Sequence, residues 1–148
     1  AIEILRSSRF KPTWGITMNV AVLRKELFKD ADLTIGNIHA EAAKRKFLKP
    51  NMELACLIRE KFSVDDINAM NLDSVVTMHE SFCNSDGYMD RLCSSCGDSG
   101  CLLDVLTYDK YDDGLDLTYD RDGFAFVVSY ELGNASAGRK AGMSSLDF

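Results

Sequence analysis

The chain has 148 residues, of which 46 % are hydrophobic and 27 % are charged. This composition is that of a single globular domain, and it excludes a disordered or low-complexity chain. No apolar run approaches the ~20 residues of a membrane-spanning helix, and Arg6, Arg9 and Lys11 stand where a signal peptide would be apolar. We therefore expect a cytoplasmic (intracellular) protein without membrane contact, or one carried within a virion if the chain is viral.

The net charge of −6 is unevenly distributed along the sequence. Residues 1–61 carry twelve Lys and Arg against seven Asp and Glu, whereas residues 62–148 carry five against sixteen. A basic half and an acidic half favour electrostatic contact with a partner, although solvated helix surfaces and acidic hairpin turns produce the same pattern.

The first half of the chain is predicted to be mainly helical. Apolar residues recur there at spacings of three and four, as on the buried side of an amphipathic helix, and Val20, Leu23 and Leu27 show this spacing clearly. Ser63 begins a capping-box pattern that ends at Asp66. The predicted helical segments are residues 17–29, a stretch from Asp32 or Thr34 to about Lys49, a helix capped by Asn51, a short helix behind Ser63, and residues 72–82.

The last third of the chain reads as antiparallel strands. The sequence Leu-Thr-Tyr-Asp occurs at residues 106–109 and again at 117–120, and each copy is followed by a turn rich in Asp and Gly. Asp-Gly between alternating apolar stretches is a strong hairpin signal. Three strands are expected, near residues 101–109, 115–120 and 124–132.

Together these elements predict an α+β fold. An N-terminal layer of about four helices would pack on a C-terminal three-stranded antiparallel meander, because the apolar side of each layer needs a cover. Residues 83–101, which are rich in Ser, Gly and Cys, would form a zinc-type loop between the two layers. We expect residues 1–132 to form one domain and residues 133–148 to form a flexible or partner-bound tail.

The sharpest chemical feature is the group of cysteines in and around that loop. Cys93 and Cys96 have the Cys-x2-Cys spacing with which two thiolates reach one tetrahedral zinc ion from a tight turn. Cys83 and Cys101 would complete a structural zinc site, with His79 as a substitute ligand. Five cysteines without a secretory signal argue against a disulfide framework. Free thiols are one alternative, and redox or disulfide chemistry of these cysteines is the other.

Two short motifs resemble those of enzyme families. His39-Ala40-Glu41 resembles the His-x-Glu half of the zinc deaminase signature, with Cys93 and Cys96 as the other half. In that family the histidine and both cysteines hold zinc, and the glutamate moves protons. Here Leu92 rather than a proline precedes the cysteine pair, and an amphipathic helix accounts for the first motif. The Gly-Asp-Ser-Gly of residues 97–100 resembles the nucleophile segment of trypsin-like serine proteases, but two β-barrels do not fit this chain.

The sequence favours a non-enzymatic interaction or assembly protein with a structural zinc-type site, such as a phage or viral accessory or virion component. Its oppositely charged halves and its tail would engage a protein partner or a larger assembly. One alternative is a nucleic-acid-binding regulator whose basic residues contact phosphates. Another is a zinc-dependent hydrolase or deaminase that needs Glu41 or Glu80. The basic residues of the nucleic-acid alternative are Arg24, Lys25, Lys44, Arg45, Lys46 and Lys49.

Overall fold

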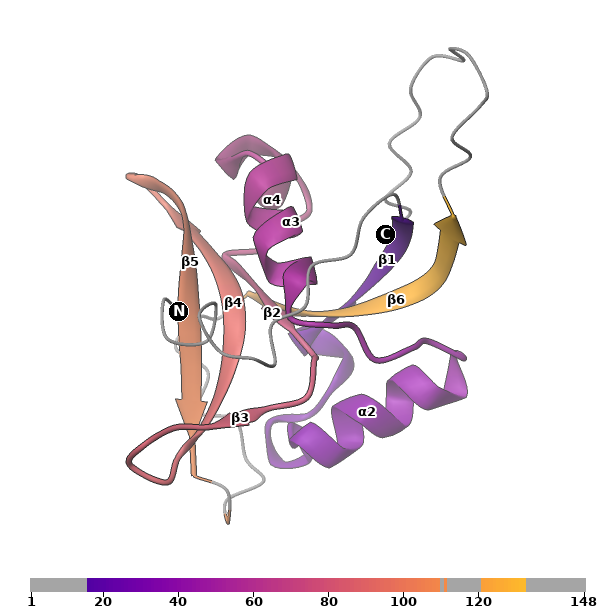
Figure 1. The fold of residues 1–148 in the computed structure, drawn as a ribbon, viewed down its shortest axis with the longest axis vertical. Coiled ribbons are helices and arrows are strands. Elements are labelled where there is room, and N and C mark those ends of the chain that lie inside the picture. Colours follow the sequence, from indigo (N-terminus) through magenta and orange to yellow (C-terminus); the bar gives the residue numbers. More distant parts are fainter. Residues whose placement is uncertain (1–15, 110, 112–120, 133–148) are drawn as a thin grey trace.

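The computed structural model describes residues 16–109, 111 and 121–132, which form a six-stranded mixed β-sheet with helices on both faces (Figure 1). The strands are β1 (Ile16–Arg24), β2 (Ser74–Thr77), β3 (Phe82–Cys83), β4 (Met89–Gly97), β5 (Gly100–Tyr108) and β6 (Asp122–Leu132). The helices are α2 (Ile35–Lys44), α3 (Glu53–Lys61) and α4 (Val64–Ala69), with short 3-10 helices at η1 (Lys25–Leu27) and η2 (Asp30–Asp32).

Strand β6 lies inside the sheet although it is the last described strand in the chain. It pairs antiparallel with β1 and parallel with β2, so the strand order is β1-β6-β2-β4-β3. Strand β4 pairs with β2 and β3 along one side and with β5 along the other. Strands β1 and β5 therefore form outer edges on opposite sides of the sheet.

Each face of the sheet is covered by its own helical layer, because neighbouring residues on a strand point to opposite faces. On one face, α2 buries Ile38 and Ala42 against Val76, Phe124 and Phe126. On the other face, α3 and α4 bury Leu54, Ile58 and Ile67 against Val75, Ala125 and Val127. The core is thus divided into two apolar layers by the central strands β2 and β6.

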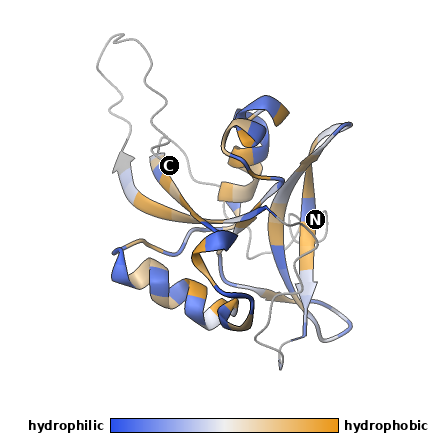
Figure 2. Ribbon diagram, turned by 180° about the vertical axis from the view of Figure 1, so that it is seen from behind, coloured by the Kyte–Doolittle hydropathy of each residue, from blue (hydrophilic) through white to orange (hydrophobic). Residues whose placement is uncertain are grey.

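The helices cover the sheet with one side only. In Figure 2, α2 carries hydrophilic and hydrophobic residues in turn along its length, as expected when one side faces a sheet and the other faces water. No helix in the described part of the chain is long and apolar enough to cross a membrane.

Helix α2 confirms the predicted cap at Thr34 but is shorter than expected. The Thr34 hydroxyl accepts the backbone N–H of Asn37 at 3.1 Å, which satisfies one of the free donors of the first turn. The helix ends at Lys44 rather than near Lys49. Lys46 has a φ of 61°, a left-handed conformation that cannot continue the helix.

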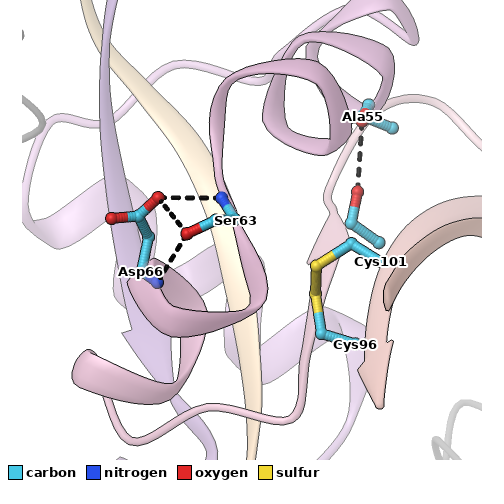
Figure 3. The surroundings of a disulfide bond; sticks show 6 residues. Ala55, Ser63, Asp66, Cys96 and Cys101 are labelled. Carbon is cyan, nitrogen blue, oxygen red and sulfur yellow. Dashed lines mark hydrogen bonds between the residues drawn. A yellow bond between two sulfur atoms is a disulfide. The ribbon is translucent and has the colours of Figure 1, made fainter. Parts of the chain in front are cut away.

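The predicted helices around residues 51 and 63 also exist as α3 and α4. Helix α3 begins at Glu53 with Met52 at its N-cap, so Asn51 is not the cap. Helix α4 begins with the predicted capping box. The backbone N–H of Ser63 donates to Oδ2 of Asp66 at 2.8 Å, and the backbone N–H of Asp66 donates to the Ser63 hydroxyl at 3.2 Å (Figure 3).

The predicted architecture of an N-terminal helical layer on a three-stranded meander is wrong. The region predicted to be helical contributes β1 and β2 to a six-stranded sheet, and only three α-helices remain among the described residues. Two predicted strands do exist, as β5 and β6, but β5 pairs with β4 while β6 pairs with β1 and β2. The predicted strand at residues 115–120 and the predicted tail at 133–148 lie outside the described residues.

Residues 17–29 and 72–82 were predicted as helices because strands buried on both faces lose the polar alternation of a surface strand. Val20 and Leu23 are both buried, but they belong to opposite faces of β1. All four residues of β2 are buried. Two-sided burial produces continuous apolar runs that also fit a helical spacing.

The predicted loop at residues 83–101 is largely a hairpin. Strands β4 and β5 pair residue by residue from Met89 opposite Tyr108 to Gly97 opposite Gly100. Gly100 adopts a φ of 106°, which a residue with a side chain rarely does, and so completes the turn at Asp98 and Ser99. Small serines and cysteines in β4 gave this strand the composition of a loop.

Candidate functional site

An open groove lies beside the β1–β6 pair, next to the C-terminal end of α2. Its volume is about 380 Å³, and its walls are mainly apolar. Residues 21–24 of β1 form one wall. Leu27, Arg45, Phe47 and Val128 complete the lining, so three separate segments of the chain meet there.

Val128 reaches the groove because the β1–β6 ladder contains an irregularity. Asn19 pairs with Ser129 and Val20 pairs with Val127, so Val128 is an extra residue opposite no residue of β1. Val128 is 44 % exposed and Leu27 is 55 % exposed. Covering these aliphatic side chains with another molecule would remove apolar surface from water.

The groove also gathers positive charge. Arg24 is the last residue of β1 and Arg45 directly follows α2, and both line the groove. Arg45 Nε lies 2.9 Å from Oε1 of Glu41, and Lys44 Nζ lies 3.4 Å from Oε2 of the same carboxylate. The hydrogen bond from Arg45 holds the pKa of Glu41 below its usual value, so Glu41 remains ionised. One carboxylate thus serves two cations, which leaves this side of the groove net positive.

The basic residues predicted to contact nucleic acid are brought together in part. Arg24 and Arg45 line the groove, and Lys44 and Lys46 are exposed on either side of Arg45 in the sequence. The fold therefore brings Arg24 and Arg45 to the same groove, although they are far apart in the chain.

Lys25 and Lys49 contribute less to this cationic surface. Lys25 is half-buried in η1. Lys49 Nζ lies 2.6 Å from Oε2 of Glu80, and this ion pair lowers the pKa of Glu80. The Glu80 carboxylate, one of the two predicted for an enzyme, therefore has a partner on its own chain.

The predicted zinc ligands do not gather at one point. Cys93 is buried on the face of the sheet that α2 covers, and Cys96 packs on the opposite face, which α3 covers. Residues three apart on a strand point to opposite faces, whereas a zinc knuckle needs a turn. Cys83 is an exposed free thiol in β3. No cluster of three or more His, Cys, Asp or Glu side chains suited to a metal ion occurs among the described residues.

Cys96 and Cys101 instead form a disulfide across the β4–β5 hairpin (Figure 3). Cys96 directs its backbone N–H away from β5, toward the carbonyl of Asp73 at 2.9 Å. Cys96 and Cys101 are therefore a pair without hydrogen bonds between their backbones, the kind of pair in which antiparallel strands approach most closely. Their Cα atoms lie 4.1 Å apart, which brings the two sulfur atoms together.

His79, the predicted substitute ligand, has both ring nitrogens occupied. The backbone N–H of Leu92 donates to His79 Nε2 at 2.9 Å, so Nδ1 carries the proton and donates to the carbonyl of Glu80 at 2.6 Å. His79 is 1 % exposed, and this burial lowers its pKa. The imidazole ring thus accepts the Leu92 N–H of β4 in place of a backbone carbonyl, at the point where the chain leaves the sheet between β2 and β3.

The residues that resemble a deaminase motif are also engaged elsewhere. His39 packs edge-on against the ring of Phe126, with ring centroids 5.6 Å apart. Glu41 binds Arg45 and Lys44 as described above. The described structure brings neither residue into a metal-binding group with Cys93 or Cys96.

Sequence reasoning missed the groove and the disulfide for different reasons. Leu27, Phe47 and Val128 come together only through the strand order, and no local pattern marks them. The disulfide had a local signal, because Cys96-Gly97 and Gly100-Cys101 flank a two-residue turn, as in a hairpin.

Comparison with known proteins shows no similarity on which to base a function: no family model, no curated protein and no solved structure matches this chain significantly.

Proposed function

We propose that this protein is a non-enzymatic interaction module that binds a protein partner at the groove beside β1 and β6. The observation that carries the proposal is the groove itself, an open apolar surface with a cationic side. Exposed Leu27 and Val128 supply apolar area, and Arg24 and Arg45 supply charge that orients a partner.

Crosslinking from a single position tests this proposal. A photoreactive phenylalanine analogue replaces Leu27 in the groove, and in a matched control it replaces Leu102, which is 60 % exposed on the remote strand β5. Extracts of the source organism are irradiated with each protein. We expect a protein adduct from position 27 that is absent from position 102, and the purified partner should bind the wild-type chain directly.

The Val128→Asp variant provides the second arm of this experiment. A charge in the apolar wall should weaken binding of the purified partner by roughly tenfold or more, because the contact would have to bury it. Equal adducts from both positions, or binding unchanged by Val128→Asp, would remove the groove as the interaction site.

A nucleic-acid-binding regulator is the second candidate, and the meeting of Arg24 and Arg45 at the groove, with exposed Lys44 and Lys46 next to Arg45 in the sequence, favours it. Fluorescence anisotropy with single-stranded and duplex oligonucleotides measures it directly. Binding through phosphates would weaken steeply as salt rises and would disappear when Lys44, Arg45 and Lys46 are all changed to Glu. Binding that is insensitive to salt and to this charge reversal would contradict it.

A further inference from the structure

The outer edge of β1 offers backbone groups that no described strand pairs with. Backbone groups of β6 alternate in direction along the strand. Those of Val127 bond to Leu48, and the Ala125 carbonyl accepts from Met78, so both residues point away from β1. Phe124 and Phe126 therefore bond to β1, at Leu23 and Ala21.

The same alternation identifies the groups on the open edge. Val20, Val22 and Arg24 stand opposite residues of β6 that point away, so their N–H and C=O groups point outward from the sheet. An added strand could bond these three residues, which lie at every second position along β1. Residues 21–24 also line the groove, so an added strand would run along the same stretch of β1 as the groove.

Charge complementarity decides what kind of strand fits. Arg24 and Arg45 lie in the groove, and Lys44 and Lys46 are exposed nearby. The Glu41 carboxylate contacts both Arg45 and Lys44, so one negative charge stands against two positive charges. A strand with carboxylates beside an apolar side chain would match this surface, whereas a basic strand would be repelled.

We propose that the partner is an extended acidic peptide segment that adds to the outer edge of β1, places an apolar side chain in the groove and directs its carboxylates to Arg24 and Arg45. Addition of a strand to a free sheet edge is a general mode of peptide recognition, in which backbone bonds give affinity and pockets give specificity. This inference rests on the proposed function and names the partner's chemistry.

The lining of the groove favours a peptide over nucleic acid. Its apolar wall is aliphatic, with Ala21, Leu23, Leu27 and Val128, and its one aromatic ring, Phe47, is half-buried. Single-stranded nucleic acid binds through exposed aromatic platforms on which bases stack, and aliphatic side chains offer no such platform.

Strand β5 provides a comparison within the same molecule. Its outer edge is likewise not paired with any described strand, yet its exposed residues include Asp104, whose carboxylate would repel an acidic strand. An acidic peptide should therefore select β1 over β5.

Selection from a library of random linear peptides tests the inference. The full chain is the target, and the counter-target is the double variant Arg24→Glu/Arg45→Glu. Selected peptides should carry two or more acidic residues, and these should alternate along the peptide with an apolar residue. A synthetic peptide of this kind should bind the counter-target at least about tenfold more weakly, and the control variant Arg59→Glu/Lys61→Glu, on the remote face of α3, should bind like the wild type.

Methylation of single peptide nitrogens provides the sharper readout. In an added strand every second peptide N–H bonds the sheet edge, so methylation should abolish binding at alternate positions and be tolerated between them. The inference would be overturned if the selected peptides lacked acidic residues, or if methylation had the same effect at every position. Tighter binding of an oligonucleotide than of the peptide at the groove would also overturn it. If Leu27 crosslinks a folded partner but no linear peptide is selected, the inference fails while the proposed function stands.

Discussion

The imidazole of His79 accepts the backbone N–H of Leu92 at 2.9 Å, and this side-chain bond fills a gap in the sheet. Strand β4 is paired with β2 up to Cys93 and with β3 at Asp90. The histidine lies in the connection between those two strands and satisfies the donor that neither of them reaches. Arg91 stabilises the same connection, because its Nε donates to the carbonyl of His79 at 3.2 Å.

We expect the free energy of unfolding to fall as the pH drops below about 6.5, the usual pKa of a histidine. Burial lowers the pKa of His79 in the folded state, and the nearby Arg91 charge acts in the same direction. Below the usual pKa the unfolded chain binds a proton that the folded chain excludes, so acid favours unfolding. Urea unfolding at a series of pH values measures this slope.

Two variants isolate the contribution of His79. His79→Gln should flatten the stability profile between about pH 5 and 7, because the titrating group is gone. His39→Gln, at the other histidine, should retain the slope. A wild-type stability that stays constant through this range would show that His79 does not carry the acid sensitivity.

The cysteines should differ sharply in reactivity. Cys83 is exposed and should react first with a thiol reagent in the native protein, whereas burial raises the pKa of Cys93 to about 12 and should protect it until the chain unfolds. Cys56 is partly buried, its pKa is also raised by burial, and it should react more slowly than Cys83. Without reductant, the unfolded chain should show three thiols, and five should appear after reduction.

The double variant Cys96→Ser/Cys101→Ser tests the disulfide and the zinc prediction together. Loss of a bridge that closes so short a loop should cost about 2 kcal/mol of unfolding free energy without reductant, and nothing when wild type and variant are both reduced. Metal content is measured on the same samples. About one zinc ion per chain that disappears in this variant would support the predicted zinc site instead of the disulfide.

Gly123→Ala should destabilise the protein by about 1–3 kcal/mol. An added methyl group at this position would lie 2.5 Å from Cγ1 of Val22 and 3.1 Å from Cδ1 of Leu72. Val22 is β-branched and held in a strand, so its side chain cannot easily rotate away from the added methyl group. Val22→Ala should restore part of the loss in the double variant, which chemical denaturation measures as a coupling energy. Gly97→Ala, where no atom lies within 4 Å of the new methyl, is the matched control.

Ser63→Ala should cost about 1 kcal/mol of unfolding free energy, because the hydroxyl caps the backbone N–H of Asp66 at the start of α4. Ser63→Thr keeps an oxygen at this position and should retain most of the stability. Thermal or urea unfolding of both variants distinguishes the lost cap from a general effect of substitution. Equal stability of Ser63→Ala and wild type would mean that the capping bond contributes nothing.

Local signals in the sequence were sufficient for the N-terminal ends of α2 and α4. The capping box at Ser63 and the hydroxyl cap at Thr34 depend on neighbouring residues only, and both helices begin where these residues predict. Helix ends were less well predicted, since the left-handed turn at Lys46 has no marker such as glycine.

Strand β1 could not be recognised by its spacing. Val20 packs toward α3 and α4, while Leu23 packs toward α2. Both must be apolar because β1 is covered on both faces, and a residue spacing of three then arises without a helix. The groove beside β1 depends on this pairing with β6, so a wrong assignment of residues 17–29 concealed the candidate site as well.

The central place of β6 has a consequence for synthesis of the chain. Residues 122–132 leave the ribosome after every other described strand, yet β1 needs β6 as its partner and β2 needs it along one side. A nascent chain that ends before residue 122 therefore presents β1 unpaired, with apolar Val20 and Leu23 uncovered on its two faces. Protection of these surfaces by chaperones should matter most in the interval before translation delivers the final described strand.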